Sequence, residues 1–290
     1  MNIPDTIISA MRQWHEEADI IGLGEAHHVP AIMECYSQLM MSNCFPQCRH
    51  IVVEFGVQKH QGLLDRYLSG ESITLDELAP VWRDSPLQAL WVYDCYRMFF
   101  HTIREINLTR PPYQHLHVWL AEPCPSDSIS DKSELSSFAH GTSASGTGQS
   151  LSIRQAMRTH AFVSLIEQLM AQQQGKIVLI FGMRHLARTP VNGRTTLVHE
   201  LLRPGRSIRV LWPEMPPRFY LKPLPIHQLE WIPLREGIGG KKVAPWGGPP
   251  TCIRELCDAV IRVPGSYRAS MCDHSLSDPP GNSGPIPFCT

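Results

Sequence analysis

The sequence predicts an α/β fold: a single domain with a mostly parallel sheet that is flanked by helices on both faces. Short apolar runs, the clearest at residues 51–55 and 176–181, are typical of strands that are buried on both sides. Segments with apolar residues at helical spacing lie between these runs, which is the order expected for parallel strands. The chain has 290 residues, of which 43% are hydrophobic and 18% are charged. This composition excludes wholesale disorder and allows one large domain.

The amino-terminal half is expected to open with a helix, followed by a strand–helix–strand unit. Ile7, Met11 and Trp14 recur at helical spacing, and Pro30 suits the first turn of a second helix. The expected elements are a helix at residues 5–17, a strand at 19–24, a helix from residue 30, a strand at 51–55, a helix that ends near residue 107 and a strand at 117–120.

The carboxyl-terminal half is expected to complete the sheet. Residues 124–150 are rich in Ser, Gly and Thr, so we expect a mobile loop or lid within a domain that spans residues 1–265. Residues 213–250 are rich in Pro and Gly, and we expect an irregular covering segment whose apolar and aromatic residues form either a pocket wall or ordinary packing. The remaining expected elements are helices at 153–173 and 197–202, strands at 176–181, 208–212 and 257–263, and a loose tail at 266–290.

Charge and cysteine usage narrow the class of protein. The net charge is −1, so no basic face is expected and nucleic acid is a poor partner. The sequence contains no run of about 18 apolar residues, so no membrane span is predicted. The first residues lack the basic patch and apolar core of a secretory signal. The nine cysteines are odd in number and irregularly spaced, which favours reduced thiols in a cytoplasmic protein. A small-molecule substrate is the expected partner, and the oligomeric state is not predicted.

Ionisable side chains stand where three of the predicted strands end. Glu25, His27 and His28 follow the first strand, Glu54 lies in the second, and Arg184 and His185 follow the strand at 176–181. Ligands bind at the carboxyl ends of the strands in open parallel sheets, so these side chains are expected to converge. A carboxylate within an apolar strand costs several kcal/mol to desolvate unless it is paired or functional. Glu54 is therefore either part of an active site or a structural ion pair, for instance with Arg184.

The two adjacent histidines are expected to differ, because neighbouring side chains diverge. One of His27 and His28 would lie beside the helix that begins at Pro30, where the helix dipole disfavours imidazolium and favours a neutral base. Gly22 and Gly24 suggest a dinucleotide fingerprint, but His27 replaces its third glycine, so that reading is rejected. The nucleophile elbow, the phosphate loop and the zinc-protease motif are absent from the sequence.

These motifs together resemble the erythromycin esterase / ChaN / Tiki superfamily. The resemblance rests on their order and strand context, and it extends from about residue 20 to residue 263. The matching features are Gly24-Glu25-x-His27-His28, Glu54, Arg104-x-x-Asn107, Arg154-x-x-Met157, Gly182-x-x-His185 and Asp258-Ala259-Val260.

The resemblance implies an α/β fold with the Glu and His residues in one cleft. The esterase branch opens a macrolide lactone, the Tiki branch looks like metal-dependent proteases, and the ChaN branch binds haem. His28 matches the first-motif histidine in the esterase spacing, and His27 matches it in the ChaN and Tiki spacing. Two departures disfavour macrolide hydrolysis: Gly182 stands where the esterases usually have a histidine, and the third strand ends in Ala121-Glu122-Pro123 rather than Gly-x-Asp.

The expected function is general-base hydrolysis of an ester, lactone or amide. A histidine after the first strand would deprotonate water, a glutamate would orient the ring, and Arg154 or His185 would stabilise the oxyanion. The same groups could instead run a cyclisation, an elimination or an acyl transfer, possible tailoring steps on a natural product. The candidate catalytic residues are Glu25, His27, His28, Glu54, Arg154 and His185, with Arg104 and Arg184 as substrate-binding residues.

Two alternatives stay open at this point. One is a haem- or metal-binding protein without catalysis, since histidines and a buried carboxylate suit a divalent transition metal. The other is a degenerate member of the superfamily whose site survives as a structural ion network. The residues alone predict no particular cofactor, and the resemblance allows a divalent metal or haem.

Overall fold

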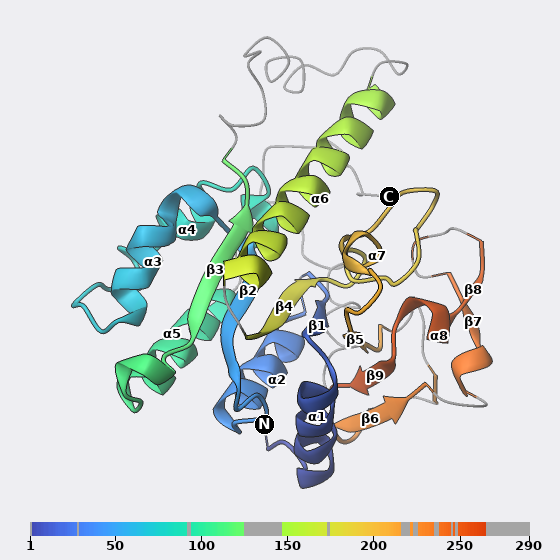
Figure 1. Ribbon diagram of the computed structural model, residues 1–290, viewed down its shortest axis with the longest axis horizontal. Coiled ribbons are helices and arrows are strands. Elements are labelled where there is room, and N and C mark those ends of the chain that lie inside the picture. Colours follow the sequence, from blue (N-terminus) through green and yellow to red (C-terminus); the bar gives the residue numbers. More distant parts are fainter. Residues whose placement is uncertain are drawn as a thin grey trace, which may run out of the picture.

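The computed structural model has one main sheet with helices on both faces (Figure 1). The expected loop at 124–150 falls mostly outside the described residues, and the expected tail at 266–290 lies wholly outside them. The structure describes residues 2–27, 29–91, 94–124, 147–172 (side chains from 155), 175–215, 221–222, 226–234, 238–244, 246 and 249–264.

A seven-stranded sheet forms the centre of the molecule, with the strand order β3-β2-β4-β1-β5-β9-β6. Neighbours from β3 to β9 pair in parallel, and β6 joins the edge antiparallel to β9. The predicted fold class, a mostly parallel α/β sheet, is confirmed. The strands are β1 (Ile20–Glu25), β2 (Cys48–Val57), β3 (His117–Glu122), β4 (Lys176–Gly182), β5 (Ile208–Pro213), β6 (Glu230–Pro233) and β9 (Ala259–Arg262).

Helices cover the two faces of this sheet, and side chains alternate between them. In β2, Glu54 faces α6, where Arg158 contacts it, whereas Phe55 packs against Phe99 and Phe100 of α5 on the other face. Burial of such a large apolar side chain stabilises the fold by roughly 1.5–3 kcal/mol. The helices are α1 (Asp5–Glu17), α2 (Pro30–Met41), α3 (Gln61–Leu68), α4 (Pro80–Arg83), α5 (Asp94–Leu108), α6 (Thr147–Gln172), α7 (Leu197–Leu201) and α8 (Ile253–Leu256).

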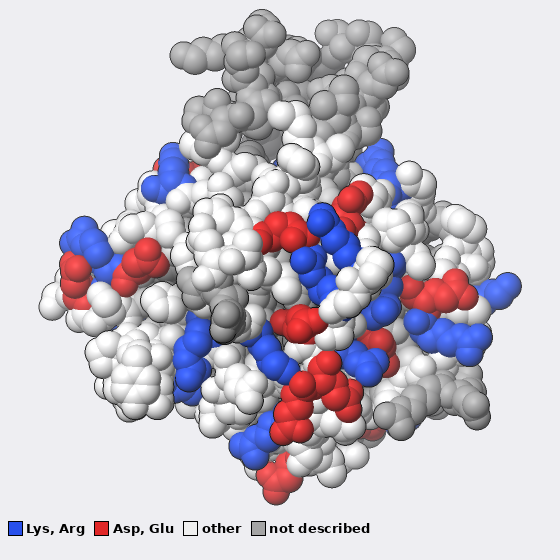
Figure 2. Space-filling model, viewed as in Figure 1, with Lys and Arg blue, Asp and Glu red and all other residues white. Residues whose placement is uncertain are grey.

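Most element positions follow the apolar pattern of the sequence. The helix predicted at residues 5–17 has those bounds, and the second helix begins at Pro30. The helix expected from residue 153 begins earlier, at Thr147, so the end of the predicted loop is helical. None of the described helices is long and apolar enough to cross a bilayer. Acidic and basic side chains are interspersed on the face drawn in Figure 2, as the near-zero net charge leads one to expect.

The segment at 213–250 departs from the prediction, because part of it is regular. β6 lies within it and completes the edge of the main sheet, and β7 (Lys242–Val243) pairs with β8 (Thr251–Cys252) in a small hairpin-like pair. Without β6, the outer side of β9 would expose unpaired backbone groups. The prolines that argued against a strand are compatible with this position, since Pro233 closes an edge strand that needs no outer partner.

Candidate active site

Four neighbouring strands end side by side at the candidate site. In sheet order, β3, β2, β4 and β1 contribute Glu122, Glu54, Gly182 and Glu25 near their carboxyl ends. Because these strands are parallel, their carboxyl ends meet at one edge of the sheet. The site is therefore produced by strand order, which brings together residues that are far apart in the chain.

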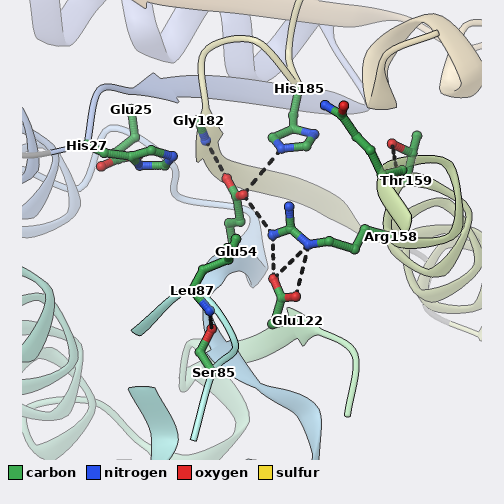
Figure 3. Close-up of polar contacts among 11 residues, drawn as sticks. Glu25, His27, Glu54, Ser85, Leu87, Glu122, Arg158, Thr159, Gly182 and His185 are labelled. Carbon is green, nitrogen blue, oxygen red and sulfur yellow. Dashed lines mark hydrogen bonds and ion pairs between the residues drawn. The ribbon is translucent and has the colours of Figure 1, made fainter. Parts of the chain in front are cut away.

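Glu54 lies at the centre of the cluster (Figure 3). Its Oε2 accepts a hydrogen bond from the backbone N–H of Gly182 at 2.8 Å, and its Oε1 lies 3.1 Å from Arg158 Nη2 and 3.3 Å from His185 Nε2. Only 2% of the Glu54 side chain is exposed. Burial alone would raise its pKa, but the contacts with His185 and Arg158 hold the pKa well below its ordinary value. Glu54 is thus a carboxylate with a histidine as one of its partners.

Arg158 joins Glu54 to Glu122. Its guanidinium from α6 contacts both Glu122 oxygens and one Glu54 oxygen. Burial and the nearby Glu54 charge raise the pKa of Glu122, and Arg158 opposes this shift. The sequence reasoning missed Arg158 and Glu122 as site residues. A signal was present, because Arg158 stands on the same helical stripe as the buried Phe162 and Ile166. A charge on an apolar stripe needs a buried partner.

A second part of the cluster forms around Glu25. His27 Nδ1 lies 2.7 Å from Glu25 Oε2, and the buried Tyr96 donates its hydroxyl hydrogen to Glu25 Oε1. The Trp91 ring stands edge-on to the His27 ring, with centroids 4.8 Å apart. Glu25 is 1% exposed and His27 is 29% exposed. The imidazole is therefore held on one side and reaches the surface on the other.

The charge state of His27 follows from its contact with Glu25. The sequence suggested a neutral ring for one of His27 and His28, beside the helix that begins at Pro30, and His28 lies outside the described residues. Burial does disfavour the charged ring, but the Glu25 carboxylate outweighs it and raises the pKa of His27 to about 9. A full charge at 2.7 Å has a stronger effect than the partial charge of a helix terminus. This raised pKa favours the protonated form of the His27 ring at neutral pH.

Gly182 separates the two parts of the cluster. A Cβ atom at this position would lie 3.2 Å from Glu54 Oε2, and 3.2 Å and 3.3 Å from Cε1 and Nε2 of His27. Glycine therefore lets the Glu54 carboxylate and the His27 ring approach the end of β4 from both sides. The structure brings together Glu25, His27, Glu54 and His185 within these contacts.

The other predicted site residues have different surroundings. His28 lies outside the described residues, and Arg154 stands in α6 with its side chain outside them. Arg184 is half-buried in the turn between β4 and His185. Arg104 donates to the carbonyl oxygens of Tyr67 and Gly70 at the end of α3, so it holds α5 and α3 together away from the cluster.

The predicted pocket wall lies elsewhere in the molecule. Trp231 and Leu234 do line a cavity of about 310 Å³ together with Trp14 of α1 and Arg209 at the start of β5. This cavity is at the amino-terminal edge of the sheet, opposite the edge that carries Glu54 and His185. Trp231 therefore lines a cavity away from the carboxylate–histidine cluster, whereas Trp246 packs against Trp212.

The cluster does not fit a divalent metal ion. Among the described residues, no group of three or more His, Cys, Asp and Glu is arranged to hold one. The Arg158 guanidinium occupies the position between Glu54 and Glu122 where a cation would bind, and it already uses their oxygens. Hence we derive no step through a metal.

Comparisons with known proteins support the fold. No family model matches the chain, and no curated protein matches it by sequence. Among solved structures, a mutant of the erythromycin esterase EreC in its open conformation is 14% identical, with 92% of this chain and 96% of that chain covered and a TM-score of 0.63. A succinoglycan biosynthesis protein is 9% identical, with 91% and 92% covered and a TM-score of 0.57. A protein from Bacillus cereus is 11% identical, with 91% and 92% covered and a TM-score of 0.54.

These similarities extend over about nine-tenths of each chain, which agrees with one domain. At such low identity they establish the fold alone. The resemblance found in the motifs is therefore confirmed as a structural one: the chain has the fold that an erythromycin esterase also has.

Proposed function

We propose that this protein is a hydrolase-type enzyme that uses its Glu/His cluster as general acid and base on an ester, lactone or amide of a small organic substrate. The observation that carries the proposal is the contact of His185 with the buried Glu54, next to a second imidazole, His27, that contacts a second buried carboxylate, Glu25. Two imidazoles that are each oriented by a carboxylate can serve as base and acid of one reaction.

His185 is the proposed base. Its Nε2 faces Glu54 at 3.3 Å, so proton exchange with a water molecule would take place at Nδ1. As the ring accepts that proton it becomes cationic, and the Glu54 carboxylate stabilises the charge and fixes the orientation of the ring. A carboxylate beside a catalytic histidine has this role in hydrolytic triads.

His27 is the proposed acid. Its Nδ1 is held by Glu25, which leaves Nε2 to donate to the oxygen that becomes negative when water attacks the carbonyl carbon. The same proton can then pass to the leaving alcohol or amine, so that the carbon–heteroatom bond breaks without release of a free anion. This assignment exchanges the roles predicted from sequence, where the first-strand histidine was the base.

Arg158 keeps Glu54 ionised and joins it to Glu122, and we propose a supporting role for it. Arg154 stands one turn before Arg158 on α6 and stays a predicted oxyanion-binding residue, and Arg184 a predicted substrate-binding one. The same set of groups also suits a cyclisation, an elimination or an acyl transfer, which use a base and an acid in the same way. The comparison with an esterase of the same fold favours hydrolysis.

The test is a hydrolysis screen with p-nitrophenyl esters, simple lactones and anilides, run on the native chain and on His185→Asn. Loss of one general base lowers turnover by about 10²–10⁴-fold. We expect a hydrolysed substrate in at least one class and that loss in the variant, with its thermal midpoint retained. A variant that keeps full activity toward every hydrolysed substrate would contradict the role of His185. The native chain could instead hydrolyse none of these substrates but catalyse cyclisation of, or elimination from, an ester-bearing substrate. That result would replace hydrolysis by a tailoring reaction.

A further inference from the structure

Tyr96 is a buried phenol that the proposed reaction does not use directly. It lies on α5, and its hydroxyl donates to Glu25 Oε1, while the other oxygen of the same carboxylate faces His27 Nδ1. Only 1% of Tyr96 and 1% of Glu25 are exposed. Tyr96, Glu25 and His27 thus contact one another in series, and His27 is the partly exposed end of the series.

We infer that Tyr96 is a positioning residue that shares the charge of Glu25 with His27, and thereby sets how readily His27 gives up its proton. The catalytic consequence rests on the proposed function, but the electrostatic arrangement does not. A carboxylate whose negative charge faces both a hydroxyl donor and a cationic ring stabilises each of them less than it would stabilise one alone. Tyr96 therefore makes His27 a better acid than Glu25 by itself would allow.

The surroundings support a fixed donor at this position. The phenol keeps its hydrogen, because burial and the neighbouring Glu25 raise the pKa of Tyr96 well above its ordinary value. Phe55 and Trp91 pack against the Tyr96 ring, with centroids 5.0 Å and 5.3 Å away. The ring has aromatic neighbours on several sides, so the hydroxyl is aimed at Glu25 by packing and not by the hydrogen bond alone.

Other charges also face His27 and belong to the argument. Glu54 of β2 favours the protonated ring, and Arg158 of α6 disfavours it. Arg158 contacts Glu54 directly, whereas the hydroxyl of Tyr96 donates to Glu25. A shift at His27 caused by Tyr96→Phe would therefore report on Glu25.

The direction of the shift separates two roles of Tyr96. If Tyr96 shares the charge of Glu25, Tyr96→Phe keeps the ring in place and gives His27 the whole carboxylate, so the pKa of His27 rises. If Tyr96 only props up the local structure, the Glu25–His27 pair loosens and the pKa of His27 falls toward its ordinary value. A hydrogen bond to a charged group corresponds to about one pH unit in such a pair.

The experiment is a titration of the imidazole signals by nitrogen-15 NMR in the full chain. His27→Asn identifies the His27 signal among the 14 histidines. Tyr36→Phe is the matched control, since Tyr36 is also a buried tyrosine near the end of β1 but donates to the backbone carbonyl of Gly24. We expect Tyr96→Phe to raise the pKa of His27 by about one pH unit, and Tyr36→Phe to leave it within a few tenths of a unit.

A second measurement, made on a double variant, separates charge sharing from a general loosening of the structure. In a Glu25→Gln background the charge to be shared is absent, so Tyr96→Phe should no longer move the pKa of His27. A fall or no change at His27 in Tyr96→Phe, or an equal rise in the Glu25→Gln background, would overturn the inference. Because no substrate is involved, the titration can succeed even if the chain proves not to be a hydrolase. If the proposed function holds as well, the high-pH limb of kcat/KM should move upward with the titration.

Discussion

Two buried ion networks lie along the same edge of the sheet and differ in the groups that they contain. The β2–β3 network consists of Glu54, Glu122, Arg158 and His185, and the β5–β9 network consists of Glu214, Arg262, Glu230 and Lys222. Both pair glutamates with arginine at strand ends, and in both the central glutamate is almost fully buried, at 2% for Glu54 and 0% for Glu214. Position at the carboxyl edge therefore does not distinguish them.

The two networks differ in whether a partner of the buried glutamate can release a proton. Arginine stays protonated over the physiological range, so a glutamate held by arginine is a fixed charge. An imidazole beside a glutamate can take up and release a proton near neutral pH. We therefore expect the β2–β3 network, and not the β5–β9 network, to take part in proton transfer.

The largest expected effect is on stability, in the β5–β9 network. Arg262→Met leaves Glu214 buried without the guanidinium that now lies 2.6 Å from it. Loss of one partner of a buried pair costs about 3–5 kcal/mol. Urea unfolding measures this loss, and turnover per folded molecule should stay normal. A stable Arg262→Met protein with reduced turnover would assign the β5–β9 network to the active site and remove the distinction.

The next effect is on turnover, in the β2–β3 network. Glu54→Gln removes the charge that stabilises a cationic His185, so turnover should fall by about 10²-fold or more. Stability should change little, because Arg158 keeps its two contacts with Glu122. Glu214→Gln is the matched control and should show the reverse pattern. An early-melting Glu54→Gln protein with normal turnover per folded molecule would make Glu54 a structural ion pair.

The pH dependence of stability sharpens the comparison further. The pKa of His27 is about 9, above its ordinary value of 6.5, so its pairing with Glu25 stabilises the fold fully below pH 6.5. That contribution, roughly 2–3 kcal/mol, is lost as the pH rises through about 9. We expect the thermal midpoint of the native chain to fall between pH 7 and 10 more steeply than that of His27→Asn. Parallel curves for the two proteins would show that His27 does not carry the charge.

The smallest expected effect concerns the glycine between the two parts of the cluster. In Gly182→Ala the new Cβ must push back the Glu54 carboxylate and the His27 ring by a few tenths of an ångström. A misplacement of this size should lower turnover by roughly 10-fold. Gly175→Ala, just before β4, is the control, because its Cβ would meet only His50 at 3.9 Å. Equal turnover in both variants would show that the close approach at Gly182 has no functional weight.

The class of the fold and the positions of most helices and strands could be predicted from the amino-acid sequence alone. Apolar runs such as residues 176–181 and apolar stripes such as that of residues 5–17 depend on local chemistry that any reader of the sequence can see. Strand ends could be located in the same way. The sequence therefore predicts four candidate residues that lie next to or within such a run: Glu25, His27, Glu54 and His185.

The partners of each charged side chain, and their effect on its protonation, could be read only from the tertiary structure. The order β3-β2-β4-β1 placed Glu122 beside Glu54, and the crossing of α6 brought Arg158 between them. The place of Arg184 after a strand and the family motif at Arg154 suggested those two residues instead, because ion pairs between distant segments leave no local pattern. The same holds for His27: the sequence could not say which of His27 and His28 would be neutral, and the short distance to Glu25 raises the pKa of His27. Electrostatic energy depends on distances between atoms, and those distances exist only once the chain has folded.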